Sequence, residues 1–419
     1  MIDIEIFRKN PQIIYDSEKK RLRGKENVDN VIKYDELWRN TLKEVENLRK
    51  HRNEVSREIN EIKKKGETGE EKIKEMREVN DKIKELEDKV NEYIENRDEY
   101  RYKVGNLVHK DVPVGDETQF KVLREGGEKK EKNIELKSHG DLIVERGLAN
   151  LEKASEVSGA RFYYLKGGLA ELMFALTNYA TDILIEEGYT LVRTPYMLRE
   201  QYMKNAAELG DFKESLYKID GEDLYLIATS EQSLAVLHAD DVLNEKELPI
   251  KYIGYSPCFR REAGSHGKDT KGLFRVHHFD KIEQFVFTTP EESWNEMEKM
   301  IKISEKIVEG LGFHYRTIDI ASGDLNDNAS RKYDIEIWMP VQKTYRELIS
   351  CSNLLDYQAR KLNIKMNRKN EKIILHTLNS TGLPIERCLA GIIENYQNEN
   401  GTITIPEKLR KYMRGKENI

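Results

Sequence analysis

Apolar residues between residues 29 and 104 recur in alternating steps of three and four, the spacing of a left-handed coiled coil. In the first half these positions hold Val31, Tyr34, Trp38, Thr41, Val45, Leu48, Arg52, Val55, Ile59 and Ile62. In the second half they hold Met76, Val79, Ile83, Leu86, Val90, Tyr93, Arg97, Tyr100 and Val104. The segment has no proline, and its two glycines, Gly66 and Gly69, lie in a polar break between the halves. The pattern predicts an antiparallel hairpin of two helices, about 48 Å long over residues 31–62 at ~1.5 Å per residue.

Two uses of such a hairpin stay open from this segment alone. It buries one thin seam, so it could serve as a dimerisation or spacer coil. It could also be an arm that reaches a large partner, because Lys63, Lys64 and Lys65 at the predicted tip could meet phosphates. Acidic residues are equally dense along the segment, and most charges on such helices are simply solvated.

The rest of the chain differs in composition from this polar segment. Residues 105–135 have turn-like and charged stretches, such as Val112-Pro113-Val114-Gly115, and after about residue 136 helices and strands of ordinary apolar content follow. The chain has 419 residues and a net charge of −6, and only 38% of its residues are hydrophobic, so one very polar segment beside a normal globular one explains the average. We predict three parts: an N-terminal arm over 1–110, a linker over 111–135 and a catalytic domain over 136–419.

The compartment and the metal content are predicted from what the sequence lacks. The sequence contains no run of about 18 apolar residues that could span a membrane, and its N-terminus has no secretory signal pattern. Three cysteines suit a reducing cytoplasm better than a disulfide scaffold. Cys258, Cys351 and Cys388 are spaced by 93 and 37 residues without a close pair, so we expect core packing and no zinc site.

The most informative stretch runs from residue 258 to 287 and reads as strand, polar loop and strand. On the second strand a period of two places one set of residues on the same face: Arg275, His277, Phe279, Lys281, Glu283 and Phe285. Such a face could hold a polyphosphate, stack an aromatic base and bind a cationic amine. The alternative is a solvent-exposed hairpin face with cross-strand ion pairs.

Several segments, in the right order, resemble the motifs of class II seryl-tRNA synthetases, and the resemblance covers essentially the whole chain. Residues 259–264 with 272–283 look like motif 2, residues 176–195 look like motif 1, and Thr229-Ser230-Glu231 resembles the TxE element. Residues 345–359 and 376–387 look like the last strands and motif 3. The resemblance implies an α+β fold: an antiparallel sheet with flanking helices as the catalytic domain, preceded by an all-α coiled-coil hairpin.

The resemblance implies a serine–tRNA ligase that uses ATP and L-serine to charge tRNA(Ser); it leaves open whether tRNA(Sec) is also a substrate. Arg260 and Arg387 are then the catalytic residues. The implied ATP-binding set is Arg260, Glu262, Arg275, Val276, Phe279, Glu347, Ser350 and Arg387. In that set Arg260 binds the α-phosphate, Arg275 faces the outer phosphates, and Phe279 and Arg387 cover the two faces of adenine. Mg²⁺ is expected with ATP at Glu347 and Ser350, because hard oxygen atoms are its ligands.

The implied serine-binding set is Thr229, Glu231, Arg260, Glu283, Asn379 and Thr381. Glu231 and Glu283 are the candidates for the serine ammonium, and Thr229, Asn379 and Thr381 for its hydroxyl. The resemblance further implies a homodimer through residues 176–195 and an arm that lies across a tRNA bound mainly to the other subunit. Two alternatives remain: a relative that delivers the adenylate to a carrier protein, and a non-catalytic tRNA-binding paralogue.

Overall fold

The computed structural model describes residues 1–129, 133–207, 215–262 and 271–419. Internal contacts divide the chain into two units. One contains Ile2–Lys19 and Arg23–Gly105, and the other contains Met1, Lys20–Leu22 and Asn106–Ile419. Within the described ranges, no helix has the length and apolar character needed to cross a membrane.

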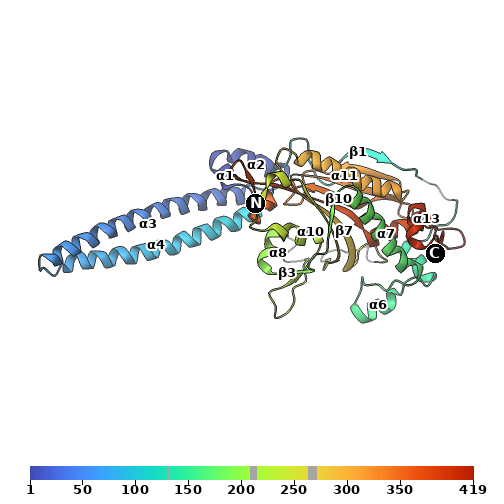
Figure 1. Ribbon diagram of the computed structural model, residues 1–419, viewed down its shortest axis with the longest axis horizontal. Coiled ribbons are helices and arrows are strands. Elements are labelled where there is room, and N and C mark those ends of the chain that lie inside the picture. Colours follow the sequence, from blue (N-terminus) through green and yellow to red (C-terminus); the bar gives the residue numbers. More distant parts are fainter. Residues whose placement is uncertain (130–132, 208–214, 263–270) are drawn as a thin grey trace. The chain divides into compact units, whose positions relative to one another are not determined.

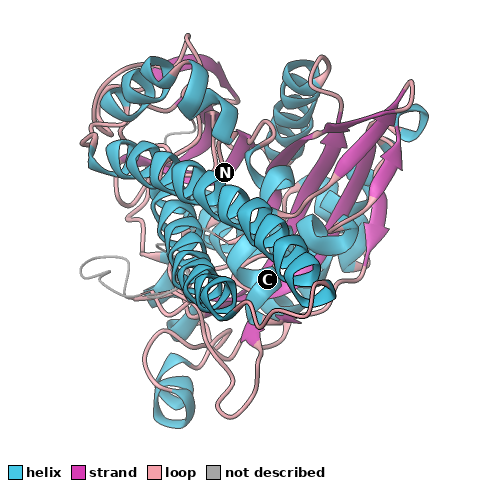
Figure 2. Ribbon diagram, turned by 90° about the vertical axis from the view of Figure 1, so that its left-hand side faces the viewer, coloured by secondary structure: helices cyan, strands magenta, loops and turns pink. Residues whose placement is uncertain are grey.

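The first unit consists of four helices, of which two form the predicted hairpin. Their bounds are α1 Ile4–Lys9, α2 Pro11–Lys20, α3 Glu26–Lys64 and α4 Glu70–Lys103. The long helices α3 and α4 lie side by side in opposite directions (Figures 1 and 2). Val45 of α3 packs with Ile83 and Leu86 of α4, which confirms the heptad seam. Gly66 has a φ of +84°, a left-handed conformation that glycine adopts without strain, in the turn between the two helices.

The second unit is built on an eight-stranded sheet in the order β1-β8-β9-β10-β13-β7-β6-β2. All neighbours are antiparallel except β2 and β6, which pair in parallel at the edge. The strands are β1 Lys121–Gly126, β2 Thr190–Val192, β6 Ile250–Phe259, β7 His278–Thr288, β8 Tyr315–Asp319, β9 Arg331–Met339, β10 Thr344–Asn353 and β13 His376–Pro384. The sheet and its helices confirm the predicted α+β class.

Helices cover the sheet and leave room for a site. The main core joins the sheet to α7 Gly168–Glu186, α11 Ser293–Gly310 and α13 Ile385–Tyr396, and Ile282 and Val286 of β7 point into it. Phe285 and Phe287 instead join a second cluster with α8 Glu200–Ala206, α10 Ser230–Ala235 and α12 Tyr357–Lys361. Alternate residues of β7 therefore face opposite sides of the sheet.

Shorter elements complete the second unit. The helices are α5 His139–Glu145, α6 Leu151–Ser158 and α14 Glu407–Arg410; the strands are β3 Met197–Leu198, β4 Tyr225–Leu226, β5 Val242–Asn244, β11 Lys365–Arg368 and β12 Glu371–Ile374. The segment predicted as a linker, 111–135, contains β1, which pairs with β8 at the edge of the sheet. None of the residues of β1 is buried, and the strand mixes charged and apolar side chains, so no alternation predicted it.

Candidate active site

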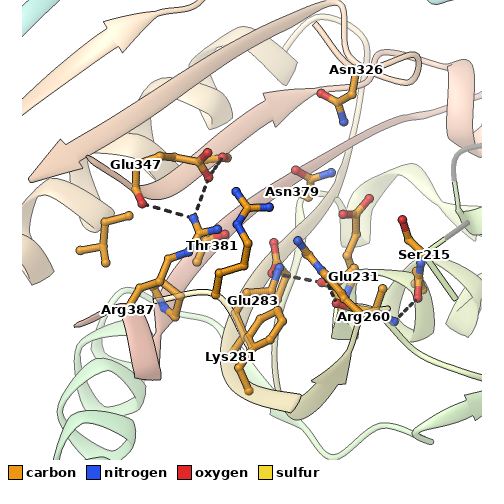
Figure 3. A pocket seen from close by; sticks show the side chains of 18 of the residues that line it. Ser215, Glu231, Arg260, Lys281, Glu283, Asn326, Glu347, Asn379, Thr381 and Arg387 are labelled. Carbon is orange, nitrogen blue, oxygen red and sulfur yellow. Dashed lines mark hydrogen bonds and ion pairs between the residues drawn. The ribbon is translucent and has the colours of Figure 1, made fainter. Parts of the chain in front are cut away.

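A cavity of about 570 Å³ lies in the second unit, and every site residue predicted from the sequence lines it. These residues are Thr229, Glu231, Arg260, Glu262, Arg275, Val276, Phe279, Glu283, Glu347, Ser350, Asn379, Thr381 and Arg387. The predicted loop of motif 2 continues through residues 263–270, which lie outside the described part of the chain. In Figure 3, Glu347 and Arg387 lie at one end of the cavity, and Glu231 and Arg260 lie toward the other.

Secondary structure fixes one group of polar side chains on the floor of the cavity. Thr229 is the N-cap of α10, where its hydroxyl accepts a 3.2 Å hydrogen bond from the backbone N–H of Glu231. Thr381 of β13 stands opposite Glu283 of β7 in the strand register, and Asn379 lies two residues before Thr381. These groups therefore have positions set by a helix end and two paired strands, which limits their freedom before a ligand arrives.

The two carboxylates predicted for the serine ammonium have different partners. Glu283 forms an ion pair with Lys281, and the Thr229 hydroxyl donates to the same carboxylate oxygen at 3.2 Å. Glu231 accepts a 3.2 Å hydrogen bond from the side-chain amide of buried Gln358, which also donates to the Ala206 carbonyl. Glu283 is thus paired with a buried cation, and the Gln358 amide holds Glu231 in place.

Guanidinium groups come to the cavity from three separate segments. Arg260, just after β6, lies 5.2 Å from the Phe279 ring centroid, and its Nε donates to the Ala228 carbonyl at 3.3 Å. Arg275 pairs with Glu262 at 3.0 Å. Arg387 of α13 lies 5.2 Å from the centroid of the Phe274 ring. This concentration of fixed cations suits an anionic ligand.

Glu347 is the carboxylate nearest to Arg387. Its Oε1 lies 3.4 Å from the Arg387 guanidinium and accepts a 3.2 Å hydrogen bond from the Ser350 hydroxyl. The Glu347 side chain is 46% exposed, and it is one of the side chains that line the cavity. The cavity walls raise the pKa of Glu347 by desolvation, but the Arg387 and Lys332 charges outweigh this effect and lower the pKa below its usual value. Glu347 is therefore an anion at neutral pH, and its two carboxylate oxygens are hard ligand atoms.

The cavity also contains residues that the sequence motifs did not single out. They include Lys281, Asn326, Asn328, Lys332, Phe274 and Glu386. The alternation on β7 had already placed Lys281 on the same face as Glu283, but the motifs assigned no role to this residue. Asn326 and Asn328 lie in a loop without a periodic signal, so only the three-dimensional structure reveals them.

Glu386 is a second buried carboxyl in the cavity wall. The Tyr163 hydroxyl donates to it, and so does the backbone N–H of Asp280, at 2.9 Å. Burial raises the pKa of Glu386 to about 8, and the nearby charge of Asp280 adds to this effect. The side chain therefore holds a proton at neutral pH more readily than a free glutamate does.

Comparison with known proteins matches both units to family models. The model of the seryl-tRNA synthetase N-terminal domain matches residues 1–108. The model of the tRNA synthetase class II core domain (G, H, P, S and T) matches residues 214–396.

Individual relatives match over almost the full length. The serine–tRNA ligase of Methanosphaera stadtmanae is 48% identical, with 99% of each chain covered. The crystal structure of seryl-tRNA synthetase from Pyrococcus horikoshii complexed with ATP matches with a TM-score of 0.93 and 42% identity, covering 100% of this chain and 99% of that one. The cytoplasmic serine–tRNA ligase of Naegleria fowleri in complex with AMP matches with a TM-score of 0.88 and 39% identity, covering 100% and 98%.

Proposed function

This chain belongs to the seryl-tRNA synthetase family, and from that premise we propose how its cavity activates serine. The protein is a serine–tRNA ligase of class II. A carboxylate oxygen of serine attacks the α-phosphorus of ATP, the bond to the β-phosphate breaks, and pyrophosphate leaves. The terminal ribose hydroxyl of the tRNA then attacks the seryl carbonyl, and AMP leaves.

We assign the cations of the cavity to the phosphates. Arg260 binds the α-phosphate and the serine carboxylate, two anions that repel each other as they meet. Arg275 binds the outer phosphates, supported by Glu262, which holds its guanidinium at 3.0 Å. This is catalysis by positioning and charge stabilisation, so no general base is assigned.

We assign adenine to the space between Phe279 and Arg387, with its edge at the Val276 backbone. The Arg260 guanidinium, a planar group, packs 5.2 Å from the Phe279 ring centroid, and this accessible ring face supports the assignment. Arg387 and Phe279 come from α13 and β7, so the two walls belong to different elements.

Mg²⁺ accompanies ATP in this proposal, held by Glu347 and Ser350. Their oxygens are hard ligands that lie 3.2 Å apart, and Glu347 is ionised, so the residues fit this ion. In the described residues no cluster of three or more His, Cys, Asp or Glu side chains forms a complete metal site. Bound at Glu347 and Ser350, the ion would neutralise charge on the phosphates.

The ion pair of Lys281 separates the roles of the two carboxylates. Glu231 is assigned to the serine ammonium, because its carboxylate lines the cavity on the first turn of α10 and Gln358 holds it there at 3.2 Å. Glu283 is assigned to the serine hydroxyl together with Thr229, Asn379 and Thr381, because its charge is already matched by Lys281. A site that hydrogen-bonds a hydroxyl discriminates against alanine, whose binding would leave those groups unpaired.

The partners and the compartment follow the same family reasoning. We propose that α3 and α4 form the arm that binds tRNA(Ser) by its shape, and that the chain forms a homodimer through residues 176–195. In support, Ile185 on α7 and Leu191 on the edge strand β2 are 48% and 49% exposed.

We keep the cytoplasm as the proposed compartment, because the three free cysteines suit a reducing environment. The limits 1–110, 111–135 and 136–419 remain proposed domain limits.

The single observation that carries the proposal is the convergence of the predicted residues on one cavity. Serine-dependent exchange of pyrophosphate into ATP tests the first step, and absence of exchange would refute it. Charging of tRNA transcripts with and without the long variable arm tests the second. Exchange without charging would favour delivery to a carrier protein, an alternative that the relatives above do not support.

A further inference from the structure

A buried histidine–glutamate pair lies outside the residues assigned so far. His139 is the first residue of α5, and its Nδ1 lies 2.8 Å from Oε1 of Glu394 on α13. The side chains are only 6% and 1% exposed. Within the described part of the chain, the imidazole Nε2 and the second carboxylate oxygen have no hydrogen-bond partner. Burying two polar side chains in this way is costly, which suggests that the pair has a task beyond filling space.

The far edge of the imidazole faces the turn that leads into the nucleotide-binding segment. A Cβ atom at Gly272 would lie only 2.4 Å from Nε2 of His139, and Gly272 has a φ of +90°. A Cβ atom at Gly140 would lie 3.1 Å from the Gly272 Cα. Two glycines therefore let this turn sit directly on the start of α5, with the histidine ring beside it.

The turn sets the position of the next residues, which reach the cavity. Leu273 and Phe274 are buried in the same core cluster as Leu142 and Ile143 of α5. Phe274 lines the cavity, and the guanidinium of Arg387 lies 5.2 Å from the centroid of its ring. Arg387 and Glu394 belong to the same helix, α13. The contacts thus form a closed loop: α13 holds His139 through Glu394, His139 abuts Gly272, and Phe274 returns to α13 at Arg387.

We propose that His139 is a positioning residue for ATP. Glu394 orients the imidazole, and the imidazole fixes the position of the turn at Gly272. This turn then places Phe274 against Arg387 and directs Arg275 towards the phosphates. The inference rests on the proposed placement of ATP in this cavity. It assigns to the pair an effect on ATP, because the loop of contacts passes through Arg387 and Phe274 but does not reach Glu231 or Glu283.

The test is pyrophosphate exchange by the full-length His139→Asn variant. An asparagine amide can still donate to Glu394, so the buried carboxylate keeps a partner, but the ring edge beside Gly272 is lost. We expect kcat/KM for ATP to fall about 10- to 100-fold, the range expected when a binding group is misplaced by about 1 Å. The KM for serine at saturating ATP should change less than about threefold.

A second variant approaches the contact from the other side. Gly272→Ala should give the same ATP-selective loss, because its Cβ would overlap the His139 imidazole. The double variant should lose less than the product of the two single losses, because the smaller asparagine side chain relieves that overlap. Asp141→Asn is the matched control: it breaks the exposed 2.5 Å pair with Lys271 on the same helix and turn, and exposed pairs contribute little. Its ATP and serine constants should stay within about twofold of the wild type.

The outcomes separate positioning from a merely structural role. An unchanged kcat/KM for ATP in folded His139→Asn would overturn the inference. So would an equal fall in the ATP and serine constants together with a lowered melting temperature. Failure of the wild-type enzyme itself to catalyse serine-dependent exchange would instead refute the proposed function on which the inference rests.

Discussion

The ion pair between Lys281 and Glu283 can be tested by Lys281→Met, which removes the cation and nearly keeps the volume. The two side chains are 9% and 3% exposed, so the substitution leaves a buried, unpaired carboxylate. Removing one partner of a buried pair typically costs about 3–5 kcal/mol. In the open cavity water can offset part of this cost, but bound serine excludes that water. We therefore expect kcat/KM for serine to fall at least about 100-fold, which corresponds to about 2.7 kcal/mol.

The assay is pyrophosphate exchange with serine varied at saturating ATP, and then the reverse. The constants for ATP should change much less than those for serine. Lys281→Met combined with Glu283→Gln should regain thermal stability, because no buried charge is left, but it should not regain serine activation. Lys251→Met is the control. Lys251 lies on the neighbouring strand β6 and pairs with Glu296 at 3.3 Å, but it does not line the cavity. Serine constants within threefold of wild type in Lys281→Met would refute the assigned role of the pair.

Three further predictions follow from the same structure. Arg387→Ala should reduce exchange at least about 100-fold and leave the affinity for tRNA nearly intact in a filter-binding assay; near-normal exchange would remove Arg387 from the site. Deletion of residues 40–95 should spare exchange but strongly reduce tRNA charging, and equal charging would show that the hairpin is only structural. Because the pKa of Glu386 is raised to about 8, the folded state holds a proton that the unfolded state releases near pH 4.5, so stability should fall as pH rises between these values. Glu386→Gln should flatten that fall, by up to about 1.4 kcal/mol per pH unit, in urea unfolding at several pH values; an unchanged slope would contradict the assignment.

Features of this protein with a regular spacing could be predicted from its sequence. The heptad positions predicted the pairing of α3 with α4, because an apolar seam that repeats every 3.5 residues packs against another helix, and the break at Gly66 and Gly69 lets the two halves pair with each other. The period of two on β7 placed Phe279 and Glu283 on one face. Both predictions use only local geometry, which the order of residues determines directly.

Contacts between distant segments could not be predicted in this way. His139 and Glu394 are 255 positions apart, and nothing in either segment indicates that they meet. Gln358 reaches Glu231 from α12, again without a local signal. Strand β1 was missed for a different reason: it is an edge strand without a buried residue, so its sequence has no alternation to detect.

The charges in the cavity are largely balanced before any ligand binds. Arg387 pairs with Glu347, Arg275 with Glu262, and Lys281 with Glu283. A ligand must therefore exchange partners rather than simply add to them. In the proposed arrangement Arg387 turns from Glu347, now 3.4 Å away, towards adenine, and the ionised carboxylate then needs another cation. A divalent ion held by Glu347 and Ser350 would meet this need, so the proposed adenine and Mg²⁺ assignments support each other. If so, Glu347→Gln should weaken the Mg²⁺ dependence of ATP binding while Arg387 still reaches the base.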